Sequence, residues 1–272
     1  MTDPAETTQP TESRTIDLSV EVPGTPEEVW DAIATGPGIT SWFMPCEVDE
    51  RVGGAVTMDF GDFGKETAKV TAWEPPVRVV FEGPSGKDDG RSLAYEWLVE
   101  ARGGGTCVVR LVNSGFGTGE EWDADYDGMT QGWKIFLENL RLHLTHFRGR
   151  HARSVLPMAM VPGPNAPAWE ALCSALGVPA DLAVGHRFAT SGGDVPPLAG
   201  MVQGAQRSEA ISEYRLLLDD GVGTAFVAAE GRGDQVALSV WLYLYGDRIP
   251  GEDRWTAWLA ERFPTSEPAQ AG

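Results

Sequence analysis

The chain has 272 residues, enough for one large or two ordinary domains, and its hydrophobic content of 42% is ample for packed cores. The 40 acidic and 21 basic residues give a net charge of -19, which repels phosphate backbones and argues against nucleic-acid binding. No apolar run approaches the ~20 residues of a membrane helix, so we expect no membrane insertion, no signal peptide and a cytoplasmic protein. The three widely spaced cysteines are typical of reduced thiols.

Ordered structure is expected to begin after a disordered leader, residues 1–14, in which Pro, Thr and Glu follow no periodic pattern. Apolar and polar residues then alternate from Ile16 to Val22, which predicts a half-buried antiparallel strand. Two short helices are predicted next, over Pro26–Ala34 and Ile39–Met44. About six further alternating segments follow, ending near Asn113 and separated by glycine-rich turns.

A long helix is predicted over Thr118–Arg148, because large apolar residues recur there in steps of three and four. Thr118 and Glu121 have the spacing of a capping box, and Gly149 stands where a left-handed residue usually ends a helix. Gly128 and Gly132 inside it each cost up to about 1 kcal/mol relative to alanine. Close backbone approach, room for a ligand or a tolerated kink would each explain them.

These elements predict an α+β fold in which a curved antiparallel sheet carries helices on one face and the long helix covers it. A gap between such a sheet and its helix would be an apolar pocket.

Several motifs occur in order over roughly residues 15–148: VPGTPEEVWDAI, ITSWF, RVGG, KVTAWEPPVRVVFE, GGTCVVRLVNSGF and the final Gly132-Trp133. Together they resemble the START-like superfamily of helix-grip proteins, and within it the branch named after the activator of heat-shock-protein ATPase. The resemblance implies a seven-stranded sheet that grips the C-terminal helix around a cavity for lipids, hormones, polyketides or other mostly apolar molecules. Its members include carriers, aromatase/cyclases, self-resistance proteins and co-chaperones, so function must be argued from the site.

The second half repeats parts of the first. Val22-Pro23-Gly24, five further residues and then Trp30 reappear as Val161-Pro162-Gly163, five further residues and then Trp169. Val52-Gly53-Gly54 likewise parallels Val184-Gly185-His186, and a Trp-x-x-aromatic-Leu pattern begins at both Trp133 and Trp255. We therefore predict a helix-grip domain with a cavity over residues 15–149, a degenerate second copy over 150–264 and a disordered tail over 265–272.

The second copy is predicted to have no ligand cavity. It lacks the segment that matches Trp42-Phe43-Met44, and its closing helix, from about Gly251 to Phe263, is too short to roof a large cavity before Pro264 ends it. Its strand Gln235–Tyr245 is apolar on both sides, as in a strand buried on both faces. The aromatic side of that strand is predicted to dock on the first copy or on a second chain, through Trp241, Tyr243 and Tyr245.

Motifs for metal or cofactor chemistry are weak, and we predict neither. Asp123, Asp125 and Asp127 imitate the start of a calcium loop, but Lys134 occupies the position that requires a bidentate glutamate. The acidic residues instead suit the positive end of a helix dipole, and His143 and His146 suit the negative end. Cys46 beside the predicted mouth would be the best candidate for a reactive thiol, although no base is near it in sequence.

The candidate ligand-binding wall combines a predicted mouth, inward strand positions and one helix face. Planar or polycyclic ligands suit such a set, held by stacking and oriented by the Tyr95 hydroxyl and the Asn113 amide. Core packing is the competing interpretation for each residue. The wall consists of Trp42, Phe43, Met44, Val56, Met58, Phe60, Tyr95, Trp97, Asn113, Met129, Trp133 and Phe136.

The sequence thus predicts a protein that carries or sequesters a small, largely apolar, aromatic or polyketide-like molecule in its first copy. Binding is favoured over catalysis because no carboxylate or histidine falls clearly on the inward positions. The alternatives are a polyketide aromatase/cyclase, in which Tyr95 or a water assists proton transfer, a natural-product self-resistance protein, and a co-chaperone that acts through its surface.

Overall fold

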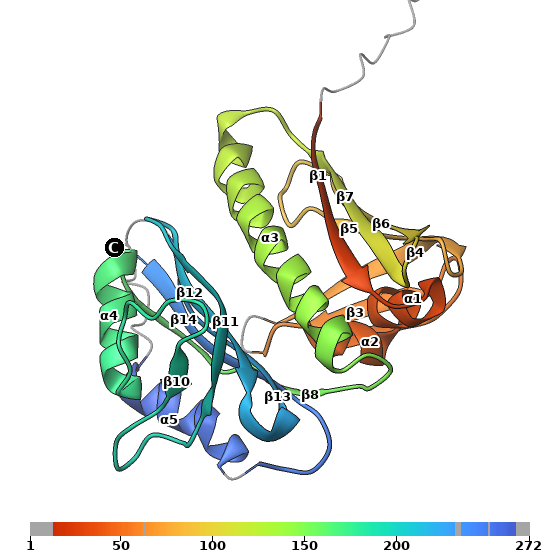
Figure 1. Ribbon diagram of the computed structural model, residues 1–272. Helices are drawn as coiled ribbons and strands as arrows, with labels where there is room; N and C mark the ends of the chain where they lie inside the picture. Colours follow the sequence, from red (N-terminus) through yellow and green to blue (C-terminus); the bar gives the residue numbers. More distant parts are fainter. Residues whose placement is uncertain (1–12, 62–63, 232–234, 250, 265–272) are drawn as a thin grey trace, which may run out of the picture. The chain divides into compact units, whose positions relative to one another are not determined.

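The computed structural model describes residues 13–61, 64–231, 235–249 and 251–264, and Figure 1 follows the chain through them. Most of the expected leader and all of the expected tail, residues 1–12 and 265–272, lie outside this described part. The first strand already begins at Arg14, inside the stretch predicted to be the leader. Within the described residues, no helix has both the length and the apolar character needed to cross a membrane.

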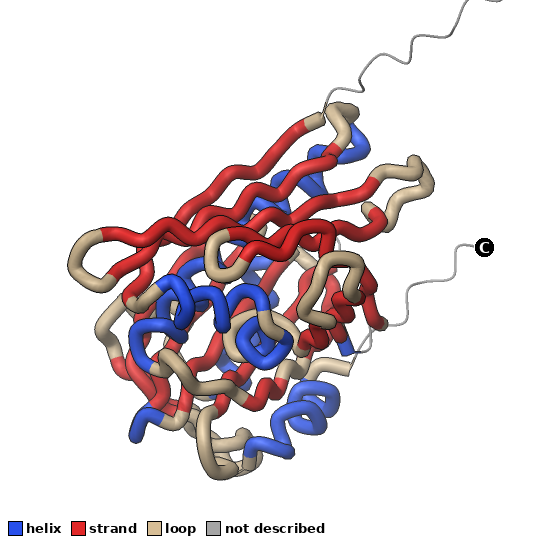
Figure 2. Tube along the Cα trace, turned by 90° about the vertical axis from the view of Figure 1, so that its right-hand side faces the viewer, coloured by secondary structure: helices blue, strands red, loops and turns tan. Residues whose placement is uncertain are grey.

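The first sheet has seven antiparallel strands in the order β1-β7-β6-β5-β4-β3-β2. The first strand therefore pairs with the last, and Figure 2 shows the long hairpins of the molecule in red. The strands are β1 (Arg14–Pro23), β2 (Cys46–Val48), β3 (Ala55–Asp59), β4 (Lys65–Glu74), β5 (Arg78–Pro84), β6 (Ser92–Arg102) and β7 (Thr106–Phe116).

The helices described with this sheet include α1 (Pro26–Ala34), α2 (Gly36–Thr40), the short 3-10 helix η2 (Glu120–Trp122) and α3 (Asp123–His146). The first helix has the predicted bounds, and Thr25 and Glu28 form a capping box that the sequence analysis missed. The second helix was misplaced, because it ends at Thr40 and not at Met44. Its Gly36-Pro37 start favours an early first turn, since proline is tolerated there.

The start of α3 also differs from the prediction. Chain entry into α3 runs through η2, whose N-cap is Gly119 with no side-chain hydrogen bond, so the expected Thr118 cap is wrong. A tight 3-10 turn satisfies the first backbone groups instead. The C-terminal end agrees with the prediction, since α3 ends at His146 and Gly149 has a left-handed φ of 72°.

The two faces of the first sheet differ as the alternating pattern predicted. Val20, Val109 and Val99 lie side by side on the buried face. On the other face, Arg110 pairs with Asp17 across β7 and β1.

The second sheet contains β10-β11-β12-β13-β14-β8 in that order, and β9 also pairs with β14. Its strands are β8 (Arg153–Val155), β9 (Met158–Pro162), β10 (Arg187–Ala189), β11 (Ala199–Arg207), β12 (Ile211–Leu218), β13 (Gly223–Glu230) and β14 (Gln235–Leu244). Its helices are α4 (Asn165–Leu176), η3 (Asp219–Gly221), η4 (Glu252–Arg254) and α5 (Trp255–Arg262).

The second sheet repeats the topology of the first, because β9 pairs with the last strand β14 just as β1 pairs with β7. The same turn leads into both. Gly53 N–H donates to Val70 O at 2.7 Å, and Gly185 N–H donates to Val202 O at 2.8 Å. A register shift follows Val70 in β4 and Val202 in β11.

The matched residues also have similar solvent exposure in the two copies. The valines before these glycines, Val52 and Val184, are 62% and 61% exposed. The fold is therefore a tandem of two helix-grip copies, as predicted. The second copy lacks counterparts of α2 and β2 and has a much shorter closing helix.

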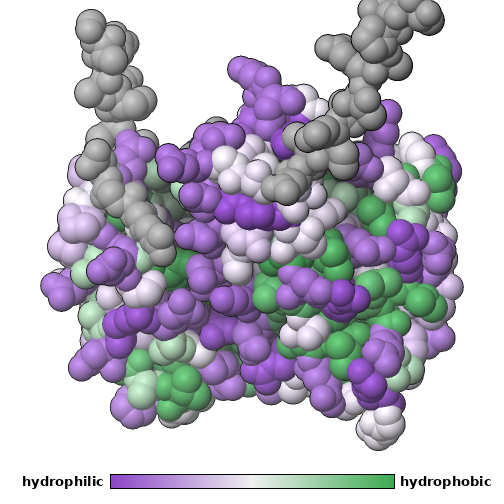
Figure 3. Space-filling view, turned by 90° about the horizontal axis from the view of Figure 1, so that it is seen from above, coloured by the Kyte–Doolittle hydropathy of each residue, from purple (hydrophilic) through white to green (hydrophobic). Residues whose placement is uncertain are grey.

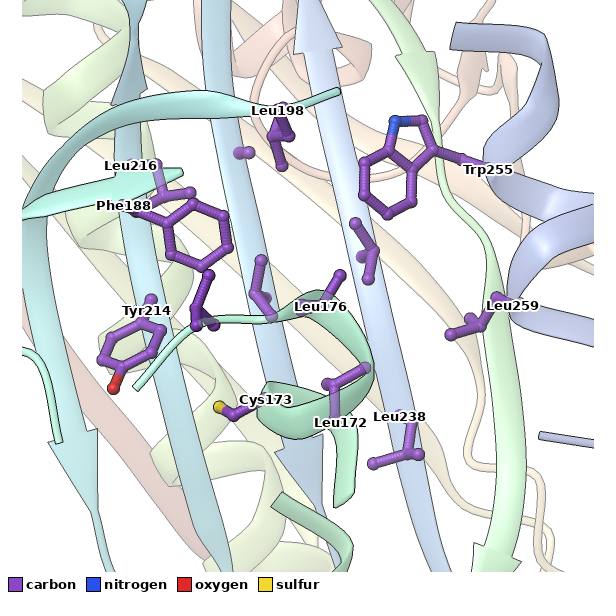
Figure 4. Close-up of a cluster of buried hydrophobic side chains, with 14 of the residues drawn as sticks. Leu172, Cys173, Leu176, Phe188, Leu198, Tyr214, Leu216, Leu238, Trp255 and Leu259 are labelled. Carbon is purple, nitrogen blue, oxygen red and sulfur yellow. The ribbon is translucent and has the colours of Figure 1, made fainter. Parts of the chain in front are cut away.

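The interior of the second copy is packed with side chains, as the prediction of a filled copy expected. Leu172, Cys173 and Leu176 of α4 lie in one buried cluster with Leu238 of β14, and Trp255 and Leu259 of α5 join the same cluster (Figure 4). Both α5 residues are essentially inaccessible to solvent. On the outside of the molecule, the view in Figure 3 shows mostly hydrophilic residues interrupted by apolar patches.

The described chain divides into two compact units that do not follow the repeat boundary. The first unit contains residues 1–35, 46–58 and 65–141, and the second contains 36–45, 59–64 and 142–272. Three segments that the sequence placed in the first copy thus group with the second half. α3 contributes residues to both units, up to Arg141 in the first and from Leu142 in the second.

Candidate functional site

Two cross-strand rows on the buried face of the first sheet form the base of the candidate site. The strand ladders place Phe81, Tyr95, Asn113 and Ile16 in one row. The next row contains Val79, Trp97, Leu111 and Leu18. The two rows differ in chemistry. The first row carries the polar atoms of Tyr95 and Asn113, whereas the second is apolar apart from the indole nitrogen of Trp97.

Trp133 of α3 lies against both rows. Its ring meets Tyr95 edge to face at 5.8 Å between centroids and Trp97 at 5.5 Å, with interplanar angles of 63° and 82°. Such T-shaped contacts are the favoured geometry for aromatic pairs. Three aromatic rings from two strands and one helix therefore meet at one place, as the sequence predicted for this part of the wall.

Asn113 is the polar anchor of this group, and it is fully buried. Its Nδ2 donates to the backbone oxygen of Ala94 at 3.1 Å, and its Oδ1 accepts a hydrogen bond from Trp133 Nε1 at 3.3 Å. A buried amide without partners would cost about 1–3 kcal/mol, so these two bonds account for its presence. Asn113 thus positions Trp133, a role that differs from the ligand-orienting one we expected.

Tyr95 provides the hydroxyl of the site. Among the described residues its hydroxyl contacts the Met129 Sδ, at 3.9 Å, and a thioether is a weak acceptor. Burial, together with the nearby Glu66 charge, raises the pKa of Tyr95 to about 12. The hydroxyl is therefore protonated at neutral pH and can donate a hydrogen bond to a stronger acceptor. Both Tyr95 and Met129 remain partly exposed.

The glycines of α3 leave open space beside this cluster. A Cβ added to Gly128 or Gly132 would meet no atom within 4 Å, apart from the helix's own neighbouring backbone. Close backbone approach is therefore not the reason for either glycine. The N-terminal part of α3 is held by ion pairs of Asp123 with Arg14 and of Asp125 with Lys87, each at 2.6 Å.

The remaining predicted wall residues of the first unit lie on β3 and α3. Val56 is fully buried, whereas Met58, which lies opposite Cys46, and Phe136 are partly exposed. Their place in the wall remains a prediction.

Four predicted wall residues belong to segments that group with the second unit. Trp42, Phe43 and Met44 lie in 36–45, and Phe60 lies in 59–64. Trp42 and Met44 are buried, and the backbone oxygen of Phe43 accepts a hydrogen bond from Tyr243. The expectation that Phe60 occupies an inward strand position was wrong, because β3 ends at Asp59 and Phe60 N–H donates to Gly64 O.

Neither thiol nor imidazole chemistry gains support. Burial, aided by the neighbouring Glu47 charge, raises the pKa of Cys46 to about 12, so the thiol is not activated as a nucleophile. His143 lies in the last turn of α3, as expected, and it is also buried and within hydrogen-bond distance of the Tyr245 hydroxyl, which the sequence did not predict. No group of three or more metal-ligating side chains occurs among the described residues.

Sequence reasoning found the members of the aromatic cluster but not the bond between Asn113 and Trp133. Periodicity placed both residues on inward faces, yet nothing in a single sequence pairs an amide with an indole 20 positions away. Tyr243 and Tyr245 donate hydrogen bonds to the backbone oxygens of Phe43 and Ser41, residues that the sequence placed in the first copy, as the docking prediction for this strand expected, although the individual pairs were not predicted.

A family model described as "Activator of Hsp90 ATPase homolog 1-like protein" matches residues 23–145. These residues include α1, all of β2 to β7 and almost all of α3. Comparison with curated proteins gives no match.

Solved structures similar to this chain fall into two groups by the part they cover. Protein MLL2253 from Mesorhizobium loti is 23% identical with a TM-score of 0.45, and the likeness covers 49% of this chain and 98% of that one. The di-domain ARO/CYC BexL from the BE-7585A biosynthetic pathway is 14% identical, covering 91% and 93% of the two chains with a TM-score of 0.45. DynU16, described as a putative protein in the dynemicin biosynthetic locus, is 17% identical with a TM-score of 0.42, covering 91% and 94%.

Proposed function

We propose that the chain, whose residues 23–145 match the family model described above, binds a small, largely apolar, planar molecule between its first sheet and α3. The observation that carries the proposal is the group formed by Trp133, Trp97 and Tyr95, in which the tyrosine remains partly exposed. A flat ligand ring would contact these aromatic side chains edge-on or face-on and would displace water from their surfaces.

The Tyr95 hydroxyl would orient such a ligand. Its contact with Met129 Sδ is long and weak, so a ligand carbonyl or hydroxyl oxygen would be a better acceptor. A molecule that combines aromatic rings with such an oxygen should therefore bind more tightly than a hydrocarbon of the same shape. Polyketide-like compounds have this chemistry.

Carriage or sequestration is favoured over catalysis by the groups that are present. The cluster contains a phenol, an amide, a thioether and two indoles, and the pKa of Tyr95 is raised to about 12. A general base is most effective when its pKa lies near the working pH. The phenol can donate a hydrogen bond but is a poor proton acceptor at neutral pH, which weakens the aromatase/cyclase alternative.

The test is a fluorescence titration of the full chain with 1-aminoanthracene, a neutral polycyclic probe. We expect saturable binding that Trp133→Ala weakens at least about tenfold, because a buried aromatic contact is worth about 1–2 kcal/mol or more. Trp255→Phe, a change in the core of the second copy, is the control and should alter affinity less than about twofold. Lack of binding by the wild type, or equal losses in both variants, would contradict the proposal.

The orienting role of Tyr95 is tested separately with anthraquinone and anthracene, which share a shape but differ in their oxygens. Wild-type protein should prefer anthraquinone, and Tyr95→Phe should reduce that preference by about fivefold, the value of one neutral hydrogen bond. An unchanged preference would remove Tyr95 from the proposal.

The description of the family supplies a second candidate, stimulation of an Hsp90-type ATPase. It requires a surface and not an interior site. Stimulation of such an ATPase that survives Trp133→Ala would favour this candidate over ligand binding.

A further inference from the structure

A carboxylate lies on the inner face of the first sheet, at Glu66 of β4. Val70 of this strand pairs with Phe81, and Phe81 pairs with Tyr95, so Val70 and Tyr95 share the inner face. Side chains two residues apart on a strand point to the same face, and the register shift of β4 comes only after Val70. Ala68 and Glu66 therefore also lie on the inner face, a position that the sequence analysis did not assign to Glu66.

The second copy supports this orientation independently. Val202 is the counterpart of Val70, so the position four residues earlier, Leu198, is the counterpart of Glu66. Leu198 is 4% exposed and belongs to the buried cluster of that copy (Figure 4). The fold thus directs this position inward in both copies, and the first copy has a carboxylate where the second has an aliphatic side chain.

Unlike its counterpart, Glu66 is exposed to solvent. It follows the turn between β3 and β4, where Phe60 N–H donates to Gly64 O at 2.9 Å. Its charge acts on the Tyr95 hydroxyl and, after burial, contributes to the raised pKa of that group. The carboxylate therefore lies on the solvent side of the proposed site, within electrostatic range of the hydroxyl that would orient a ligand.

The basic side chains at this end of the first copy are already paired with aspartates. These ion pairs are Arg14 with Asp123 and Lys87 with Asp125, each at 2.6 Å, and Arg91 with Asp89 at 3.5 Å. Glu66, in contrast, has no ion pair or hydrogen bond within the part of the chain that the structure describes. Its negative charge is therefore not compensated locally, and the net charge of -19 on the whole chain adds to the same field.

A carboxylate beside aromatic rings is a suitable environment for an organic cation. An ammonium group can donate charge-assisted hydrogen bonds to the carboxylate and is also attracted to the faces of aromatic rings. Tyr95 is partly exposed and packs edge to face on Trp133, so one of its faces could meet such a group. A ligand that carries a carboxylate would instead be repelled by Glu66.

We propose that the site around Trp133 prefers planar aromatic molecules that carry a protonated amine, and that Glu66 is the residue that selects for this charge. The inference rests on the proposed function, because it names the chemical class of ligand for the same site. Glu66, Tyr95 and Trp133 all belong to one compact unit, which includes residues 65–141.

The experiment uses three probes that share the anthracene ring and differ in charge. They are 9-(aminomethyl)anthracene, which is positive at neutral pH, the neutral 9-anthracenemethanol and the negative 9-anthracenecarboxylate. Each is titrated by fluorescence against the full chain as wild type, Glu66→Gln and Glu82→Gln. Glu82 is the matched control, because it is exposed on the neighbouring strand β5 and lies next to the inward Phe81, hence on the opposite face.

We expect the wild type to bind the ammonium probe most tightly and the carboxylate probe most weakly. Glu66→Gln should weaken binding of the ammonium probe about threefold to tenfold and leave the alcohol within about twofold of the wild type. Glu82→Gln should change all three affinities less than about twofold. Added salt should reduce the preference of the wild type for the ammonium probe.

The neutral alcohol separates failure of this inference from failure of the proposed function. Binding of the alcohol together with equal wild-type affinity for the ammonium probe, or equal losses in Glu66→Gln and Glu82→Gln, would overturn the role of Glu66 and leave the proposed function standing. Failure of all three probes to bind would contradict the proposed function and this inference with it.

Discussion

The inner faces of the two sheets differ at matched positions. Counting along the ladders from Val70 and Val202, the first copy has Tyr95, Trp97 and Asn113. The second copy has, at the same places, Ala225, Val227 and Leu242. The second set is aliphatic and inaccessible, and belongs to one continuous core. One scaffold therefore exists in two forms, with aromatic and polar groups inside in one and a plain hydrocarbon core in the other.

The outer faces differ in the opposite sense. The first sheet presents Arg110, Val112 and Ser114, whereas the matched residues of the second are Ser239, Trp241 and Tyr243. Arg110 is solvent-exposed, and Trp241 and Tyr243 are buried. The two sheets thus share a topology, but in the second copy the inner face is aliphatic core and the outer face is buried at Trp241 and Tyr243.

The strongest way to break this comparison is to remove a tryptophan from the core of the second copy. Trp255 is fully buried, so Trp255→Ala should lower the free energy of unfolding by about 3–5 kcal/mol. Trp133→Ala in the first copy should cost less stability, because its ring partner Tyr95 is partly exposed and can rearrange. Urea unfolding of both variants measures the difference, and equal costs would show that the two interiors are packed alike.

A reciprocal exchange sharpens the comparison at one matched position. Leu242→Asn would bury an amide among aliphatic side chains and should cost about 3 kcal/mol or more, from lost apolar burial and unmet hydrogen bonds. Asn113→Leu should cost about 1–3 kcal/mol, because it leaves the buried Trp133 Nε1 and the Ala94 oxygen without Asn113. Both are measured by urea unfolding, and a larger loss for Asn113→Leu would contradict the assignment of the plain core to the second copy.

Buried charge on the second sheet predicts a pH dependence that the first sheet should lack. Burial, together with the charge of Glu213, raises the pKa of Glu230 from 4.5 to about 7. Glu213 in turn lies 3.2 Å from Arg215, and among the described residues Tyr243 also interacts with Glu230. At pH values between 4.5 and about 7, Glu230 keeps its proton in the folded chain but has released it in the unfolded chain. The free energy of unfolding should therefore fall as pH rises from about 4.5 to about 7.

Glu230→Gln is the matching control, because glutamine keeps the shape and cannot ionise. Urea unfolding between pH 4.5 and 8 should show a smaller decline for this variant than for the wild type. Parallel curves for the two proteins would show that Glu230 does not titrate in this range.

Much of the fold follows from local sequence signals. The Val-Pro-Gly turn before each tryptophan-bearing helix and the Val-Gly turn before β3 and β10 depend on a few neighbouring residues, so the repeat could be found without a structure. The loss of α2 from the second copy followed from the shorter spacing alone. Period-two alternation likewise identified the inward position of Tyr95 and the two buried faces of β14.

The parts that the sequence did not predict depend on distant contacts. Thr118 has the right spacing for a cap, but the 3-10 turn at η2 makes the first turn with backbone groups alone. His143 looks like a residue at a helix end until Tyr245, 102 positions away, buries it. Segment 36–45 likewise groups with the second unit, where Tyr243 and Tyr245 donate hydrogen bonds to the backbone oxygens of Phe43 and Ser41. Single-sequence patterns report on neighbours along an element and carry no information about such pairs.

The smallest expected effect concerns the glycines of α3, which have no counterpart in the short α5. Gly132→Ala should raise the free energy of unfolding by about 0.5–1 kcal/mol, because alanine favours helix and the added methyl meets open space. The same methyl would occupy that space next to Met129 and Phe136, so affinity for a planar probe should fall. Gly128→Ala is the matched control, since it gives the same gain in helix propensity one turn earlier and farther from the apolar stripe. Urea unfolding and probe titration of both variants distinguish the two reasons for a glycine here. Equal gains in stability with a loss of affinity only in Gly132→Ala mean that the helix gives up stability to leave room for a ligand. Unchanged affinity in both variants would leave Gly132 as a merely tolerated residue.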